Sequence, residues 1–70
     1  MLEELLKENG LEKLHKRLEQ NHFDADILKE IVKHEDAYMK DIVRGNCNIS
    51  HLDMDRLQKA IEHLIDQENI

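Results

Sequence analysis

The chain is 70 residues long and carries ten Lys and Arg against sixteen Asp and Glu, a formal net charge of −6 at pH 7. This balance argues against a nucleic-acid-binding surface, which needs clustered basic side chains to release counterions from phosphates, and against binding to anionic membranes. Apolar residues make up 40% of the chain and Pro is absent, so we expect one folded, all-helical domain over residues 1–70.

Two short helices are predicted at the start of the chain. The first spans residues 2–8 and ends before Gly10, because glycine readily adopts the left-handed backbone that closes a helix. The second spans residues 11–20, where leucines recur at helical spacing. Asp24 is expected to accept hydrogen bonds from the free N–H groups of a third helix. The side chains expected to point into the core from this half are Leu2, Leu5, Leu6, Leu11, Leu14, Leu18, Phe23, Ile27 and Leu28.

The segment over residues 24–43 supports two interpretations. Apolar pairs recur along it, and their spacing fits either one continuous helix or two short helices. No Gly or Pro lies near its middle to force a break. We expect two helices with a kink or tight turn at residues 33–36.

A loop and a long helix complete the chain. Residues 44–50 contain Gly45 and two Asn, which are turn residues, and are predicted to form the loop. Ser50 followed three residues later by Asp53 is a helix-capping signal, so the last helix is expected to begin there and to end near residue 67. Its apolar stripe is expected to contain Leu57, Ile61, Leu64 and Ile65. The sequence thus predicts a compact bundle of about five short helices in which the C-terminal helix is the longest.

The order of these features resembles the SAM (sterile alpha motif) domain family. The resemblance is carried by Gly10-Leu11-Glu12, Leu14, Leu18, Asn21, Phe23-Asp24-Ala25 and Leu28, and it resumes in the run N-I-S-H-L-D-M-D-R-L-Q-K-A-I-E-H-L. It covers residues 4–28 well, 48–64 moderately and 29–47 poorly. Leu5 stands where the family usually has an aromatic residue. The resemblance implies a helical module that binds other proteins and has no enzymatic activity.

SAM domains commonly associate when an acidic face around the middle helices, called mid-loop, meets the start of the last helix of a partner, called end-helix. The resemblance places the mid-loop face of this chain at Asp24, Asp26, Glu30, Glu35, Asp36 and Asp41. It places the end-helix face at His51, Leu52, Met54, Asp55, Arg56 and Lys59. An exposed Leu52 or Met54 could anchor a contact, because buried apolar side chains carry much of the energy of an interface. The acidic residues also fit a simpler interpretation, helix capping and solubility.

The charges at these faces predict the kind of partner. Asp53 and Asp55 reduce the positive charge that an end-helix face usually has, so two copies of the chain would bring like charges together. We therefore expect a monomer or weak dimer whose acidic face pairs with a basic partner protein, such as another SAM domain with a basic face. The same two residues argue against the RNA-binding branch of the family, so no nucleic-acid partner is expected.

The sequence contains no recognisable motif for catalysis, metal binding or a cofactor. The five histidines, at positions 15, 22, 34, 51 and 63, include no pair at i,i+4 spacing, and one cysteine does not complete a zinc site. Cys47 and His51 could act as nucleophile and base, but no third group orients them, and a free loop thiol is the simpler interpretation. We expect no enzyme activity, metal or cofactor. The single cysteine and the lack of a signal-peptide pattern predict an intracellular, cytoplasmic protein.

Two functional hypotheses remain open from the sequence. The first is a non-enzymatic protein–protein interaction module of the SAM type that recruits or scaffolds a partner. The second is a free-standing small acidic helical regulator, of the inhibitor or antitoxin type, that blocks a basic site on an enzyme or nucleic-acid-binding protein. A long multidomain reading frame would favour the module, and a gene of about this length would favour the regulator.

Overall fold

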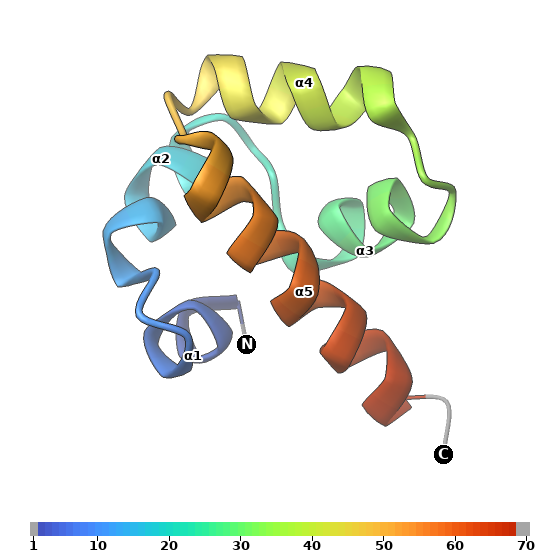
Figure 1. The fold of residues 1–70 in the computed structure, drawn as a ribbon. Helices are drawn as coiled ribbons and strands as arrows, with labels where there is room; N and C mark the ends of the chain where they lie inside the picture. The colour runs from blue at the N-terminus through green and yellow to red at the C-terminus, as the bar shows by residue number, and fades with distance from the viewer. Residues whose placement is uncertain (1, 69–70) are drawn as a thin grey trace.

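The computed structural model describes residues 2–68 and is helical over most of that range (Figure 1). The elements are α1 (Leu2–Glu8), a 3-10 turn (Glu12–Leu14) that leads directly into α2 (His15–Gln20), α3 (Ala25–Lys33), α4 (Ala37–Asn46) and α5 (His51–Glu68). No strand occurs among the described residues. The expected all-α bundle with a longer C-terminal helix is confirmed. The expected domain also includes Met1, Asn69 and Ile70, which lie outside the described residues.

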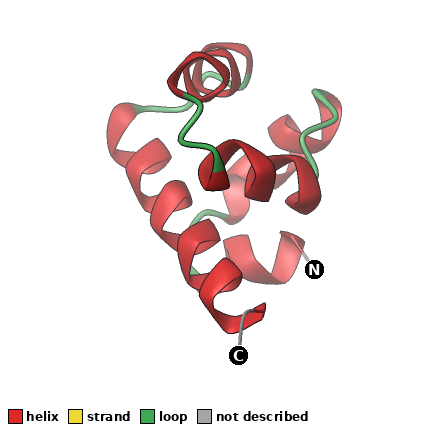
Figure 2. Ribbon diagram, turned by 90° about the vertical axis from the view of Figure 1, so that its right-hand side faces the viewer, coloured by secondary structure: helices red, strands yellow, loops and turns green. Residues whose placement is uncertain are grey.

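α5 is the longest of the described helices. It runs diagonally across the molecule with α1 and α3 packed on it, and α4 lies across the end at which α5 begins (Figures 1 and 2). Helices as short as α1 and α2 are not stable alone in water, so their structure depends on this packing.

The core is one continuous apolar cluster that draws on every helix. Eight of the side chains expected to point inward are buried, namely Leu6, Leu11, Leu14, Leu18, Phe23, Leu28, Leu57 and Ile61. Leu2, Leu5 and Ile65 are partly buried at its edge. The expectation for Ile27 is wrong: its side chain is 40% exposed. Leu28 and Ile31 form the inward face of α3, and Ile27 lies outside that face.

The segment over residues 24–43 forms two helices, as expected, although neither Gly nor Pro separates them. Asp36 makes the break possible by capping α4: its Oδ1 accepts a hydrogen bond from the Met39 amide at 3.0 Å. The amides of Glu35 and Asp36 donate to Val32 O and Ile31 O, both at 3.1 Å, which closes α3. Glu35 adopts a left-handed backbone with φ of 49°. The turn therefore places a carboxylate residue where glycine is usual.

Replacing Glu35 with glycine should raise the free energy of unfolding by about 1 kcal/mol. A left-handed backbone costs a non-glycine residue roughly 1–3 kcal/mol, and the greater freedom of glycine in the unfolded chain offsets part of the gain. Urea denaturation of the wild type, Glu35→Gly and Glu35→Ala measures the effect. Alanine keeps the strained backbone and serves as the control, so a glycine variant no more stable than the alanine variant would contradict the prediction.

The connection between α4 and α5 is shorter than the expected loop over residues 44–50. α4 continues through Gly45 to Asn46, and only residues 47–50 link the two helices. Val43 and Cys47 lie one turn apart and are both buried, so the C-terminal end of α4 packs against the core. Cys47 is a free thiol in this link, as expected, and it is buried. Its Sγ donates to Arg17 O at 3.7 Å, and burial raises the pKa of the thiol.

Candidate functional site: an acidic groove beside the second helix

A groove of about 510 Å³ lies between α1, α2 and the start of α3. Leu2 and Phe23 contribute apolar surface to it. Its carboxylates come from three separate elements: Glu3 in α1, Glu19 in α2 and Asp24 at the start of α3. His15 and His22 also line it, and among residues 2–68 no Lys or Arg does. The groove thus presents the carboxylates of Glu3, Glu19 and Asp24 around an apolar surface.

Local backbone structure holds these side chains in place. His22 adopts a left-handed backbone with φ of 63° just after α2. The turn lets the Phe23 amide donate to Leu18 O at 2.9 Å, which directs the following residues back toward α2. Asp24 then begins α3, and its Oδ1 accepts a hydrogen bond from the Ile27 amide at 2.9 Å. The carboxylate of Asp24 is thus fixed at the groove by its role as a helix cap.

The start of α5 is the second surface that the sequence singled out. Ser50 caps the helix as expected, with its Oγ accepting from the Asp53 amide at 3.2 Å. Leu52 is 64% exposed, whereas Met54 is 9% exposed and packs in the core. Of the two proposed apolar anchors, only Leu52 is therefore available. The physical reason is helical geometry: Met54, Leu57 and Ile61 lie on the inward face of α5, and Leu52 does not.

Both aspartates near this surface have basic partners. Lys13 Nζ lies 3.0 Å from Asp53 Oδ2, and Lys59 Nζ lies 3.7 Å from Asp55 Oδ2. The Asp53 side chain is only 14% exposed. The hydrogen bond from Lys13 lowers the pKa of the Asp53 carboxyl, and the contact with Ser50 acts in the same direction. The start of α5 is therefore closer to neutral than the sequence alone indicated.

The Asp53 ion pair predicts a specific acid sensitivity. Because the pKa of Asp53 is lower in the folded protein, its stabilisation is present at neutral pH and is lost as the pH falls below about 4 toward the folded-state pKa. We expect Asp53→Asn to be less stable than the wild type at pH 7 and to approach it near pH 3. Thermal unfolding of both proteins across this range measures the difference. A gap that stays constant with pH would show that the carboxylate charge is not involved.

The structure distributes the six expected mid-loop residues over several places instead of one face. Asp24 lines the acidic groove, and Asp36 caps α4. Asp26 Oδ1 lies 3.4 Å from Lys29 Nζ, and Glu30 Oε2 lies 3.1 Å from His34 Nε2. Glu35 lines a cleft between α3 and α5. The capping interpretation therefore accounts for two of the six residues, Asp24 and Asp36.

Asp41, the last of the six, lies beside the expected end-helix residues. A hollow of about 180 Å³ between α4 and α5 is lined by Asp41 together with His51, Met54 and Asp55. The two expected faces therefore adjoin here, because α4 crosses the molecule at the start of α5 (Figure 1). Arg56 and Lys59 lie farther along α5 and are exposed.

Sequence reasoning missed most of the acidic groove. Glu3, His15, Glu19 and His22 were not among the expected site residues, although all of them line it. His15 and Glu19 carried one usable signal, their i,i+4 spacing on a predicted helix; His15 Nε2 lies 3.5 Å from Glu19 Oε2. No sequence pattern indicated that Glu3 of α1 would line the groove, because this depends on how α1 packs beside α2.

Comparisons with known proteins identify no relative. No family model, no curated protein and no solved structure matches the chain. Within residues 2–68, no group of three or more His, Cys, Asp or Glu side chains is arranged to hold a metal ion. None of the described helices is both long enough and apolar enough to span a membrane.

Proposed function

We propose that this chain is a non-enzymatic protein–protein interaction module whose acidic groove binds a basic segment of a partner protein. The observation that carries the proposal is the composition of the groove. Apolar surface from Leu2 and Phe23 lies beside three carboxylates, and in the described part of the chain neither Lys nor Arg lines the groove to neutralise them. Such a surface is complementary to an apolar side chain flanked by Lys or Arg.

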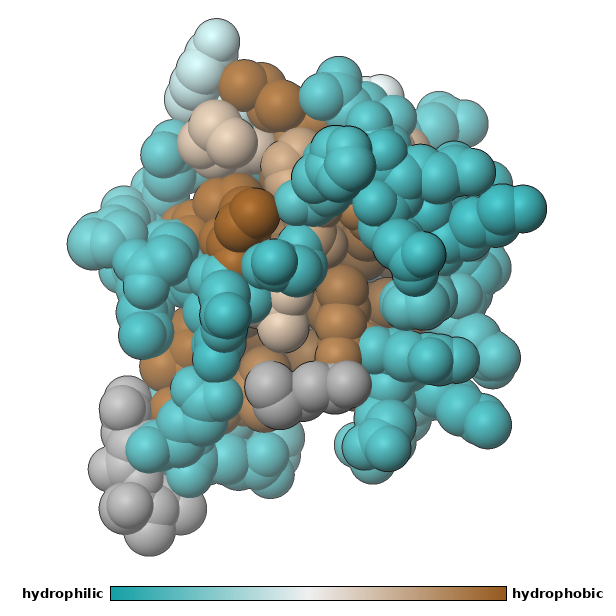
Figure 3. All heavy atoms as spheres, turned by 180° about the vertical axis from the view of Figure 1, so that it is seen from behind, coloured by the Kyte–Doolittle hydropathy of each residue, from teal (hydrophilic) through white to brown (hydrophobic). Residues whose placement is uncertain are grey.

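The resemblance to SAM domains supports this proposal independently. Phe23 and Asp24, which line the groove, belong to the part of the sequence in which the resemblance is best. Domains of that family act by binding other proteins, commonly through an acidic face. Apolar surface bordered by hydrophilic side chains is also visible on the face opposite to that of Figure 1 (Figure 3). Exposed apolar surface of this kind is typical of interaction sites when it is contiguous.

Random-peptide phage display on the purified protein tests the proposal. We expect the selected peptides to share an apolar residue flanked by Lys or Arg. A synthetic peptide of the selected sequence should bind more weakly as salt is raised, because its charges are screened. The double variant Glu3→Lys, Glu19→Lys should weaken binding by roughly tenfold or more, since it reverses two of the three groove charges.

A matched control separates the groove from the overall charge of the protein. The double variant Glu8→Lys, Glu12→Lys makes the same charge change at exposed positions that do not line the groove. It should leave the affinity nearly unchanged. Equal weakening by both double variants would mean that net charge alone attracts the peptide. Selected peptides without basic residues would also contradict the proposal.

A further inference from the structure

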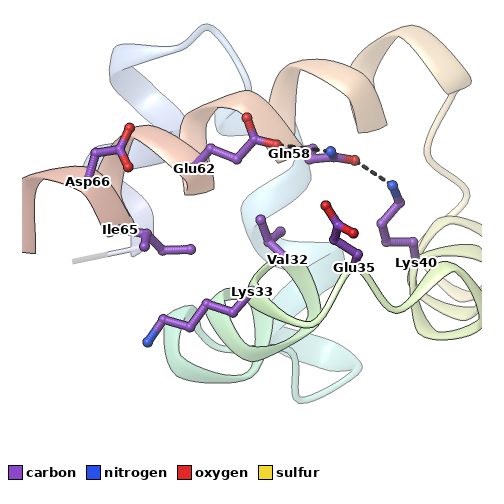
Figure 4. Close-up of a pocket in the computed structure, with 8 residues that line it drawn as sticks. All are labelled: Val32, Lys33, Glu35, Lys40, Gln58, Glu62, Ile65 and Asp66. Carbon is purple, nitrogen blue, oxygen red and sulfur yellow. Dashed lines mark hydrogen bonds between the residues drawn. The ribbon is translucent and has the colours of Figure 1, made fainter. Parts of the chain in front are cut away.

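A second concave surface lies between α3 and α5, and it shares no lining residue with the acidic groove (Figure 4). Its volume is about 380 Å³. Val32 from α3 and Ile65 from α5 form its apolar floor, and both pack against the core. Glu35 borders it from the α3–α4 turn, and Lys40 borders it from α4. The cleft is therefore built from three helices and one tight turn.

A chain of hydrogen bonds holds one wall of this cleft. Lys40 Nζ donates to Gln58 Oε1 at 2.6 Å, and Gln58 Nε2 donates to Glu62 Oε1 at 3.0 Å (Figure 4). The amide of Gln58 is thus engaged on both sides, which orients Glu62. Lys40 is bound to this amide and forms no ion pair with a carboxylate within residues 2–68.

The described lining of the cleft has more acidic than basic side chains, with Glu35, Glu62 and Asp66 against Lys33 and Lys40. None of these three carboxylates forms an ion pair among residues 2–68. Glu62 and Asp66 are one turn apart on α5, a spacing at which like charges repel. Lys33 and Lys40 lie toward opposite ends of the cleft, with Glu35 and Val32 between them (Figure 4). The middle of the cleft is therefore an apolar floor beside unpaired carboxylates.

We propose that this cleft binds an arginine side chain of a partner protein. The aliphatic part of the side chain packs on Val32 and Ile65, as long basic side chains do on apolar surface. The guanidinium group donates hydrogen bonds to the carboxylates of Glu62 on α5 and Glu35 in the α3–α4 turn. Arginine fits better than lysine because its planar group offers five donors and can bridge carboxylates from two elements, whereas an ammonium group is a compact point charge.

NMR titration of the ¹⁵N-labelled protein tests this assignment. The probe is a short acetylated and amidated peptide with one central arginine between alanines. Its matched control has citrulline, which is neutral and of similar shape, in place of arginine. We expect the arginine peptide to cause saturable shift changes at the amides of Val32, Glu35 and Ile65. The citrulline peptide should bind roughly tenfold more weakly or worse, because the charge is lost, and the lysine peptide should lie between them.

Two variants show whether the carboxylates are responsible. In Glu62→Gln the side chain can still accept the hydrogen bond from Gln58. The variant should bind the arginine peptide several-fold more weakly, because one negative charge is removed. Glu35→Gly should weaken binding while making the protein more stable, so misfolding cannot explain the loss. The groove variant Glu3→Lys, Glu19→Lys should leave the shifts at the cleft unchanged.

Three results would overturn the inference: equal binding of the citrulline peptide, shifts centred on Phe23 instead of the cleft, or no saturable shifts with the arginine peptide. The second result would still support the acidic groove as a basic-peptide site. If phage display selected no basic peptide but the arginine peptide still shifted the amides of the cleft, the proposal for the acidic groove would fail and the proposal for the cleft would stand. The two proposals can therefore fail separately.

Discussion

Replacing Leu18 with alanine should lower the free energy of unfolding by about 2–5 kcal/mol. Leu18 has 0% exposure and belongs to the cluster that joins α2 to the rest of the core. Removing its side chain loses the transfer free energy of the buried atoms and leaves a cavity that a small protein fills only in part. Total stabilities of small proteins are about 5–15 kcal/mol, so this loss is a large share of the stability of the domain.

Leu57→Ala should have a comparable effect, because Leu57 is 1% exposed at the centre of α5. Leu52→Ala is the matched control: it removes the same atoms from the same helix at an exposed position, and it should change stability by less than about 0.5 kcal/mol. Chemical denaturation measures all three variants, with one common value for the dependence of the unfolding free energy on denaturant concentration. Changes below roughly 1 kcal/mol at both Leu18 and Leu57 would mean that the inward faces are wrongly assigned.

The isolated protein should sediment as a monomer or weak dimer, and Asp55→Lys should convert it to larger assemblies. Two copies that each carry a net charge of −6 repel one another, most strongly at low salt. Pairing of Asp53 with Lys13 and of Asp55 with Lys59 leaves the start of α5 near neutral, so it attracts the acidic groove only weakly. Leu52 is its one strongly exposed apolar side chain because Met54 is buried, whereas stable interfaces bury about 1,200–2,000 Å².

Asp55→Lys removes one negative charge, adds a positive one and releases Lys59 from its ion pair. The surface around Leu52 then becomes basic and complementary to the acidic groove of another copy. Because these two surfaces differ, their contact is heterologous and can continue into open-ended assemblies. Adding Leu52→Glu should abolish them. Sedimentation at low and moderate salt decides the matter. Large oligomers of the wild-type protein at low salt would show that an apolar contact overcomes the repulsion.

The helices and their limits follow largely from short-range signals in the sequence. Gly10, with φ of 70°, follows the end of α1. Asp24 and Ser50 cap α3 and α5 by accepting hydrogen bonds from the backbone amides three residues later. Apolar spacing identified Leu18 of α2 and Leu57 and Ile61 of α5 as inward-facing residues. These features could be predicted because each depends on residues within about one helical turn of each other.

The break between α3 and α4 and the extent of α4 were harder to predict. The break has no Gly or Pro, and it depends on Asp36 as a cap and on a strained backbone at Glu35. α4 reaches Asn46 because Val43 in its last turn and Cys47 directly after it are both buried. In this case tertiary packing outweighed the turn preference of Gly45, since burial of a side chain contributes more than local propensity.

Only the tertiary structure decided where the charges and hollows lie. The sequence by itself determined an acidic, all-helical chain with a defined apolar core. It did not determine that Lys13 forms an ion pair with Asp53, that Glu3, Glu19 and Asp24 line one groove, or that Glu35 lines one cleft with Val32 and Ile65. Each of these arrangements joins residues from separate helices. Their relative placement is set by the packing of α1, α3 and α4 around α5, which no local sequence pattern encodes.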